Sequence, residues 1–445
     1  MMEHSHDAAM YTTAAISLAT IAVVFTLILF LGKRFKQDIP LAINLFVSSA
    51  AGAAVVGFGI PLRQLFEGPV WYIYINLVIL TGMIFLTVMK HSGNLDCITW
   101  DILTKFRNHP VILFILLTVM VYFPGMFTGV GTAAVLSTGV FAAAILRIVG
   151  VPRAQNGAII AMLSTLGAAA PPVNIPALII ASGINMPYEG FDAILWALTI
   201  PLGLFSIFFI GYRYFKTPTM AQIEAEMPRP ERKNFIMPYV PLIVVVAIFM
   251  LIRIFPGKFP DIITPMVFMV GSIVGLFTGK KLNYVKASKE AVQGGVFNTV
   301  ALLFVVGTVV QITTLTGAKG LVVLGALTLG AVAPVVMYAA LGISLPLIGG
   351  VLTHLGASVI LGIPFTLALL TQNVIVVVAA ISILCVLAQI IPPSAVGGYF
   401  AQGVVQEPKY GAILKHCAIP TVVSIVVAIV ALVFANQLAN ILVPF

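Results

Sequence analysis

Runs of about twenty apolar residues recur along the whole chain, and they constrain its fold more than any other feature. A helix needs about 20 apolar residues to cross the hydrocarbon of a bilayer. Of the 445 residues, 60% are hydrophobic and 8% are charged, whereas soluble chains carry about 25% charged residues. We therefore predict an all-α polytopic membrane protein. The predicted spans cover residues 13–31, 42–61, 70–89, 193–212, 237–254, 262–278, 296–316 and 418–442.

The basic residues are concentrated in short loops between these runs. The formal net charge is +9, and loops rich in Lys and Arg stay on the cytoplasmic side of a membrane. When the runs are threaded alternately through the bilayer, nearly all of the 23 Lys and Arg residues fall on one side. The exceptions are Arg63, Arg253, Lys258 and Lys319. We therefore predict an inner-membrane protein with both termini in the periplasm and no nucleic-acid partner. The first seven residues contain no basic n-region, so we also expect no cleaved signal peptide.

Residues 154–184 form a further apolar run, but its centre contains helix-breaking residues. Pro172 and Pro176 have no backbone N–H, so each leaves a carbonyl without its helical partner. Within hydrocarbon, such a break survives only where it is buried in protein or lines a cavity. A second break of this kind lies at residues 392–398 of the run 374–402. Two interrupted spans in corresponding halves of a chain point to the binding site of a transporter.

Two further apolar runs contain glycine-rich interruptions. The first covers residues 111–150 and is interrupted at 124–132, and the second covers 332–370 with its interruption near 349–356. Each run forms either two full spans or one re-entrant hairpin. Both arrangements return the chain to the side of the membrane that it left, so the flanking charges do not distinguish between them. The run 154–184 must be a crossing, because otherwise the basic loop 213–233 would lie outside. We therefore assign the re-entrant hairpins to the two glycine-rich runs.

Each half of the chain then contains three spans, a hairpin, a broken span and a final span, and the halves start on opposite faces. This order predicts two inverted repeats. The predicted parts are scaffold helices at 1–110, a first hairpin and broken helix at 111–192, connecting helices at 193–316, a second hairpin and broken helix at 317–410, and a C-terminal helix at 411–445.

The chemistry of the chain argues against an enzyme. All fourteen Asp and Glu residues are expected in loops, tails or helix ends, so the membrane interior has no carboxylate proton relay. Paired catalytic carboxylates and the HExxH zinc motif are absent from the sequence. The three cysteines are far apart and form no CxxC motif, which excludes a typical zinc site. We expect no organic cofactor.

Small polar residues remain at membrane depth, around the two breaks and the two glycine-rich tips. Hydroxyl and unwound carbonyl oxygens suit Na⁺, and the N-terminus of a half-helix attracts an anion. We therefore predict a site for a small organic anion and a coupled Na⁺. The candidate residues are Thr128, Gly129, Gly131, Thr132, Ser164, Thr165, Gly167, Pro172, Asn174, Gly349, Gly350, Thr353, His354, Pro393, Ser394 and Gly397.

Each of these residues also has a purely structural interpretation. Small residues let membrane helices pack closely. His354 either carries a proton or binds the substrate, or it is a neutral, hydrogen-bonded histidine at a hairpin tip. Gln311 and Gln389 are typical of hydrogen bonds between membrane helices.

From Thr128 to Pro172 the chain resembles the large membrane subunit of tripartite ATP-independent periplasmic (TRAP) transporters. The resemblance lies in the glycine-containing tip, the basic turn at 147–153 and Ser164-Thr165-Leu166-Gly167 followed by Pro171-Pro172. The Pro-Pro-Ser-Ala-Val-Gly segment at 392–397 resembles the closing region of that family. The first tip reads Thr-Gly-Val where the family usually has Ser-Gly-Ser, and the second tip lacks the usual acidic residue.

This resemblance implies an elevator mechanism, in which hairpins and broken helices slide against a fixed scaffold with substrate and Na⁺. It also implies two partners, a small membrane subunit and a periplasmic binding protein that delivers a carboxylate or sialic-acid-like anion. The alternative is a stand-alone carboxylate symporter or exchanger of the same superfamily. A channel is a weaker alternative, because the sequence contains no charged ring or repeated filter motif. A membrane enzyme is weaker still.

Overall fold

The computed structural model describes residues 2–35, 37, 39–227, 229–231, 234–255, 258, 260, 262–293, 295–392 and 395–442. These residues form helices joined by turns, with no strand among them, so the all-α prediction is confirmed. Within these ranges, seven helical stretches are long and apolar enough to cross a membrane, as expected for a polytopic membrane protein. They are Met10–Gly32, Leu41–Phe58, Ile73–His91, Pro110–Thr128, Gly131–Ile148, Asp192–Tyr214 and Tyr410–Val433.

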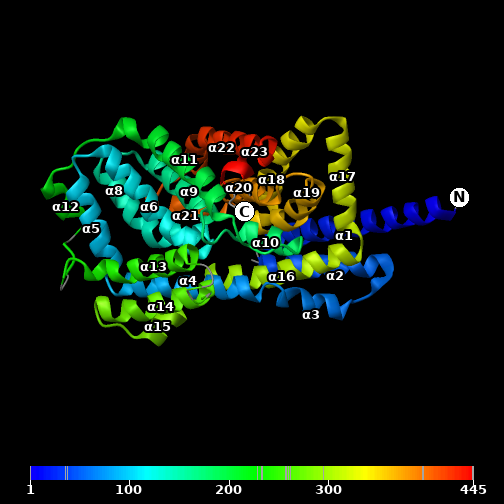
Figure 1. Ribbon diagram of the computed structural model, residues 1–445, viewed down its shortest axis with the longest axis horizontal. Coiled ribbons are helices and arrows are strands. Elements are labelled where there is room, and N and C mark those ends of the chain that lie inside the picture. The colour runs from blue at the N-terminus through cyan, green and yellow to red at the C-terminus, as the bar shows by residue number, and fades with distance from the viewer. Residues whose placement is uncertain are drawn as a thin grey trace.

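The helices form two layers, which Figure 1 shows one above the other. In the lower layer α4 packs against α14, and α16 packs against α2 and α3. Small residues allow this close approach, since a Cβ at Gly68 of α3 would lie 2.5 Å from the carbonyl carbon of Gly307 of α16. The lower layer contains α1 (Met2–Phe35), α2 (Leu41–Ala53), α3 (Leu62–Val70), α4 (Ile73–His91), α13 (Val240–Ile254), α14 (Thr264–Thr278), α15 (Tyr284–Val292) and α16 (Gly295–Leu315).

The upper layer contains both glycine-rich runs and both broken helices. Its central helix α9 packs against α6, α11, α21 and α22, and α20 packs against α18 and α22. The layer contains α6 (Pro110–Thr128), α7 (Gly131–Ala134), α8 (Val140–Ile148), α9 (Arg153–Ala169), α10 (Ile175–Gly183), α11 (Asp192–Gly211), α18 (Pro334–Ala357), α19 (Ile363–Ala368), α20 (Val374–Val386), α21 (Val396–Val405), α22 (Tyr410–Val433) and α23 (Ala435–Leu442). Two short π-helical segments, η2 (Val135–Gly139) and η5 (Ser358–Gly362), continue the second arms of the two runs.

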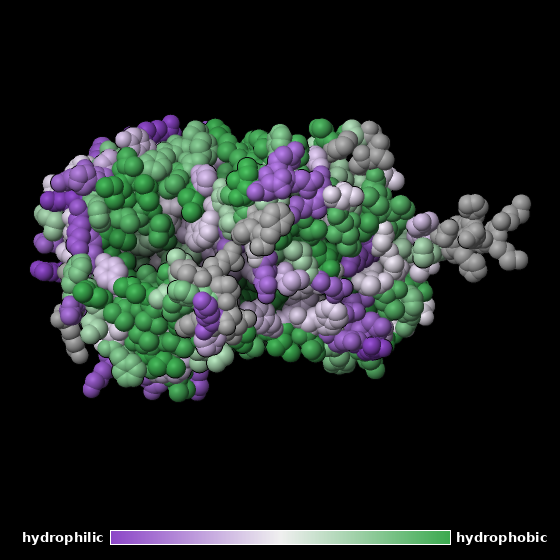
Figure 2. Space-filling view, in the orientation of Figure 1, coloured by the Kyte–Doolittle hydropathy of each residue, from purple (hydrophilic) through white to green (hydrophobic). Residues whose placement is uncertain are grey.

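Apolar side chains cover much of the molecular surface, as a lipid-facing protein requires. Figure 2 shows broad hydrophobic areas on this face, with hydrophilic residues along the margin where α5 (Asn94–Phe106) and α12 (Met220–Glu226) lie and in smaller patches elsewhere. Large apolar side chains such as Val23 and Phe30 on α1 are each 64% exposed. In water this exposure would be unfavourable, but in hydrocarbon it costs nothing.

Three predicted boundaries are wrong. The polar loop predicted after residue 89 contains α5, and its Asp101 is buried, with the carboxylate accepting a 3.0 Å hydrogen bond from the Tyr239 hydroxyl. Residues 317–331 were assigned to the second hairpin part without a helix of their own, but they form most of α17 (Ala318–Val332), which lies at 76° to α16. The last span begins at Tyr410 instead of residue 418, because Lys415 is exposed on α22 and does not end the helix.

The first glycine-rich run breaks between α6 and α7, at Gly129 and Val130. Both of its arms are long enough to cross a membrane, so helix length does not distinguish two full spans from a re-entrant hairpin. The second run departs from helical geometry at Thr353, where φ is 69° and ψ is 162°. Its arms cover Val335–Gly350 and Thr353–Ala368 and are shorter. The re-entrant assignment stays a prediction for both runs.

Candidate functional site

The first break separates α9 from α10 by five non-helical residues, Ala170 to Asn174. The peptide bond between Pro171 and Pro172 is cis. Asn174 begins the new helix, because its side-chain oxygen accepts a 3.0 Å hydrogen bond from the backbone N–H of Ala177. Asn is among the best N-cap residues for this reason. The apolar run is therefore broken around its prolines and restarted at Asn174.

Asn174 also connects the two halves of the chain. Its side-chain nitrogen donates a 2.7 Å hydrogen bond to the hydroxyl of Ser382 on α20 and a 3.0 Å hydrogen bond to the carbonyl of Ala169. Asn174 is completely buried. The amide nitrogen thus bonds both to its own broken helix and to the second one, while the amide oxygen caps α10.

A tyrosine from the following loop completes the surroundings of Asn174. The backbone N–H of Asn174 donates a 3.2 Å hydrogen bond to the hydroxyl oxygen of Tyr188. Burial, reinforced by the nearby Asp192 carboxylate, raises the pKa of Tyr188 well above its ordinary value. Tyr188 is therefore a neutral phenol at physiological pH, and its ring stacks on Phe191 with the centroids 4.9 Å apart.

The first tip lies directly against the first break. The backbone N–H of Val173 donates a 3.0 Å hydrogen bond to the carbonyl of Met126 at the end of α6. Gly129 has a positive φ of 65°, and a Cβ there would lie 2.4 Å from Cγ1 of Ile175. Glycine is needed at this position both for the backbone conformation and for the close approach.

The same tip also reaches the second break. A Cβ on Gly131 would lie 2.3 Å from the side-chain oxygen of Gln389 and 3.1 Å from the carbonyl oxygen of Ser164. Gln389 ends the short turn that follows α20, and Ser164 lies in α9. The tip of the first run is therefore in contact with the broken helices of both halves.

The second tip packs on the second break. A Cβ on Gly350 would lie 3.0 Å from the carbonyl oxygen of Ile391 and 3.1 Å from that of Pro392, and one on Gly349 would lie 2.4 Å from the Ala388 Cβ. Gly397, at the start of α21, is buried. Pro393 and Ser394, which were predicted for the site, lie outside the described residues.

Three buried polar atoms around these breaks have no hydrogen-bond partner among the described residues: Thr165 Oγ1, Thr353 Oγ1 and Gln389 Nε2. A buried polar group without a partner costs about 1–3 kcal/mol, and such groups mark functional sites or places where water or an ion binds. Thr353 also has the strained positive φ of 69°, which is unusual for a β-branched residue and is typical of functional sites. Three unpartnered buried polar atoms therefore lie around the breaks and tips, although others, such as those of Ser17 and Asn76, lie elsewhere in the described structure.

Other predicted residues use their polar groups within their own helices. The hydroxyl of Ser164 donates to the carbonyl of Ala161 at 3.0 Å, and that of Thr128 donates to Pro124 at 2.7 Å. A Cβ on Gly167 would lie 2.9 Å from the Cα of Tyr122, so this glycine serves the packing of α9 on α6. In the described conformation these three residues have structural roles.

Three predicted residues are only half-buried, namely Thr132, Pro172 and His354. The carbonyl of His354 accepts a 2.7 Å hydrogen bond from the Ser358 hydroxyl, which helps to restart the helix after the second tip. His354 thus lies at the tip as predicted. Whether its imidazole binds substrate stays a prediction.

Sequence reasoning missed Ser382 and Tyr188, and it treated Gln389 only as a hydrogen bond between helices. Ser382 is the single hydroxyl in the otherwise apolar stretch of α20, and that isolation was the available signal. Tyr188 had no such signal, because a tyrosine in a polar loop is ordinary. Only the return of that loop over the break brings its hydroxyl to Asn174.

The site contains neutral oxygen atoms and amides instead of a transition-metal ligand set. Among the described residues, no group of three His, Cys, Asp or Glu side chains can hold a metal ion. Carbonyl, hydroxyl and amide oxygens are hard ligands that suit monovalent or divalent cations of the Na⁺ and Ca²⁺ type.

No protein-family model and no curated protein sequence matches this chain.

Proposed function

We propose that the protein is a secondary active transporter that takes up a small organic anion of the carboxylate class together with Na⁺ across the bacterial inner membrane. In this proposal it is the large membrane subunit of a TRAP-type system. The observation that carries the proposal is the meeting of both broken helices with the first tip, at Asn174, Gly131 and Gln389. Broken helices that meet in this way form the substrate sites of secondary transporters.

The unpartnered polar atoms support an ion site at this meeting point. Thr165 and Gln389 belong to the broken helices of opposite halves, and Thr353 belongs to the second tip. Na⁺ bound near Thr165 would give its hydroxyl oxygen the partner it lacks. The N-terminus of α10, which Asn174 caps, presents partial positive charge to the anion. Neither role requires a charged side chain in the membrane.

The order of elements supports two inverted repeats. In the first half, α3, α4 and α5 lead into the run α6–η2–α8 and then into α9 and α10. In the second half, α15, α16 and α17 lead into α18–η5–α19 and then into α20 and α21. Both runs carry a five-residue π-helical segment early in the second arm, at Val135–Gly139 and Ser358–Gly362. A local feature this uncommon in corresponding places favours a duplicated unit.

The two layers support an elevator mechanism. Both tips and both breaks belong to the upper layer, whereas α2, α3, α4, α14 and α16 form the lower layer (Figure 1). We infer that the upper layer carries the substrate and that the lower layer stays fixed. Helices α5 and α17 connect the layers along the chain, since each follows a lower-layer helix and precedes one of the two runs.

Uptake into liposomes that contain the purified chain tests this proposal. A panel of labelled mono- and dicarboxylates is supplied with a Na⁺ gradient or a K⁺ gradient, with and without a candidate binding protein and small membrane subunit. We expect uptake that needs Na⁺ and both partners. Uptake that is indifferent to Na⁺ would refute the coupling, and Na⁺-dependent uptake without the partners would favour the stand-alone symporter. Passive, non-saturating flux would favour a channel.

A further inference from the structure

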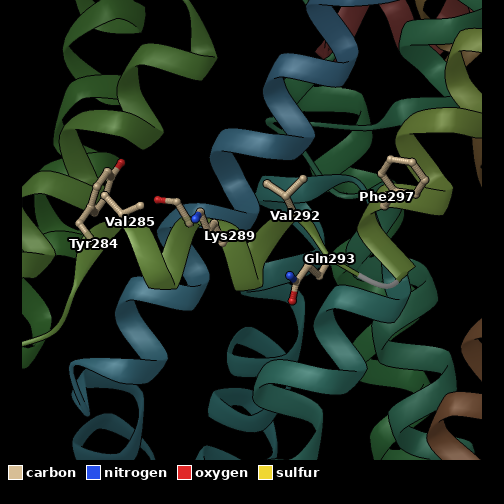
Figure 3. Close-up of a pocket in the computed structure, with 7 residues that line it drawn as sticks. Tyr284, Val285, Lys289, Val292, Gln293 and Phe297 are labelled. Carbon is tan, nitrogen blue, oxygen red and sulfur yellow. The ribbon is translucent and has the colours of Figure 1, made fainter.

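A groove outside the proposed site follows one face of α15. It has a volume of about 840 Å³ and is lined by Tyr284, Val285, Ser288, Lys289, Val292, Gln293 and Phe297. The first six form three neighbouring pairs, 284–285, 288–289 and 292–293, which are four positions apart. Residues four positions apart lie on the same face of a helix, so the three pairs share one face. Figure 3 shows Phe297 at the far end of the groove, on the first turns of α16. The adjoining face of α15 is buried, at Ala287 and Ala291, and α15 packs against α4.

The groove exists because the chain leaves helical geometry between α15 and α16. Gln293 ends α15 in an extended conformation, with φ −79° and ψ 163°, and α16 begins at Gly295. The interruption changes the direction of the chain and leaves a concave outer face at the junction. Phe297 and Val285 remain 62% exposed on this face.

The groove combines an apolar surface with hydrogen-bond donors. Val285, Val292 and Phe297 supply the apolar part, and Lys289 supplies an exposed ammonium group. The hydroxyl oxygen of Ser288 is buried and has no hydrogen-bond partner among the described residues. A ligand that fits this lining has an anionic oxygen-rich end and a long apolar end.

The charge around the groove is strongly positive. Lys280, Lys281, Lys286 and Lys289 lie within ten residues of sequence. The acidic residue on the same helix, Glu290, pairs with His91 at 3.1 Å, and Asp96 faces Lys280 and Lys90. Lys286 and Lys289 are therefore available to an external anion. Clusters of this kind at the end of membrane helices attract anionic lipid headgroups.

We propose that this groove binds an anionic phospholipid. The phosphate lies at Lys289 and Ser288 with Gln293 as a further donor, and an acyl chain runs over Val292 and Phe297. A free phosphate ion would use the lysines but would leave the apolar half of the groove without a partner. This inference depends on the membrane location of the chain and not on the proposed transport function.

Native mass spectrometry of the full-length protein in detergent, titrated with phosphatidylglycerol or phosphatidylcholine of the same acyl chains, tests the proposal. We expect phosphatidylglycerol to bind in preference to phosphatidylcholine. Lys289→Gln should weaken phosphatidylglycerol binding about fivefold, equivalent to about 1 kcal/mol for one lysine at a lipid surface. Phe297→Ala should weaken the binding of both lipids. Lys415→Gln, which removes an exposed lysine from α22, should leave both affinities unchanged.

Three results would overturn the proposal. The first is equal binding of the two lipids by the wild-type protein. The second is an affinity of Lys289→Gln for phosphatidylglycerol that equals that of Lys415→Gln. The third is displacement of the lipid by inorganic phosphate at a concentration similar to that of the lipid, which would identify an ion site instead. The thermal unfolding midpoint of each variant without added lipid verifies that folding is unchanged.

Discussion

The side-chain nitrogen of Asn174 donates a 2.7 Å hydrogen bond to the hydroxyl of Ser382, across 208 positions of sequence. Asn174 starts the second part of one broken helix, and Ser382 lies in the first part of the other. The same asparagine caps α10 through Ala177. A single buried amide therefore sets the start of one helix and its contact with the opposite half.

Replacing Asn174 should reduce transport more than it reduces stability. Asn174→Ala removes the helix cap, which typically costs about 0.5–2 kcal/mol, and leaves Ser382 without its donor. Asn373→Ala is the matched control, because Asn373 caps α20 through the N–H of Val376 at 3.2 Å and is only half-buried. Thermal unfolding in detergent and initial uptake rates per folded molecule are measured for both. If the two variants lose transport equally, Asn174 acts only as a helix cap and has no further role in transport.

Thr165→Val should weaken Na⁺ dependence without lowering stability. The Thr165 hydroxyl has no hydrogen-bond partner among the described residues, so its removal costs no bond and can be neutral or stabilising. The concentration of Na⁺ that gives half-maximal uptake should rise, because a proposed oxygen ligand is lost. Thr199→Val, which removes a hydroxyl that donates to Leu195 at 2.7 Å, is the control. An unchanged Na⁺ dependence in Thr165→Val would exclude Thr165 from the ion site.

Gly131→Ala should be destabilising, and a change in Gln389 should compensate. The new Cβ would lie 2.3 Å from the Gln389 side-chain oxygen, and overpacking of this kind costs about 1–3 kcal/mol. The double variant Gly131→Ala, Gln389→Ala should regain the thermal midpoint but not the uptake rate. Gly411→Ala is the control, since nothing lies within 4 Å of its Cβ position. A double variant no more stable than Gly131→Ala would contradict the contact.

Lys319 should restrain movement of the upper layer against the connecting helix α17. Its ammonium group, on α17, donates a 2.9 Å hydrogen bond to the carbonyl of Gly183 at the end of α10. A cation at a helix C-terminus stabilises it by about 0.3–1 kcal/mol. Lys319→Met should increase hydrogen exchange at the amides of Ile184 and Met186 and raise the turnover rate, whereas Lys319→Arg should preserve both values. Faster exchange with unchanged turnover would place this contact outside the moving interface.

Asp96→Asn should change how stability depends on pH. Burial raises the pKa of Asp96 above 3.8, although Lys280 and Lys90 oppose the shift. The folded state therefore holds this proton more tightly than the unfolded state, and the contribution of Asp96 to stability falls as pH rises from 3.8 through the folded pKa. Asp96→Asn should remove this loss and raise the unfolding midpoint at neutral pH. Identical pH profiles for the variant and the wild type would contradict the prediction.

The helical class and the positions of the first break and first tip were predictable from local features. Long apolar runs predict membrane helices, and Pro172, Pro176 and Asn174 end one helix and start another through their own backbone and side-chain chemistry. The structure has α9 end at Ala169 and α10 begin at Ile175, as this chemistry requires. The sequence ended the preceding span at residue 316, where the structure bends by 76°, but the short apolar stretch after the bend was not predicted to form the separate helix α17.

By itself, the sequence determined that the chain is helical and apolar and that the run 154–184 must break near its prolines, because these properties depend on residues that are neighbours along the chain. Only the tertiary structure decided which groups meet at the breaks. Gly131 lies against Gln389, and Ser382 and Tyr188 both reach Asn174. Such pairs depend on how helices from two halves cross, and the crossing is set by the combined packing of many small residues. The tertiary structure also decided which buried hydroxyls, such as that of Thr165, have no hydrogen-bond partner among the described residues.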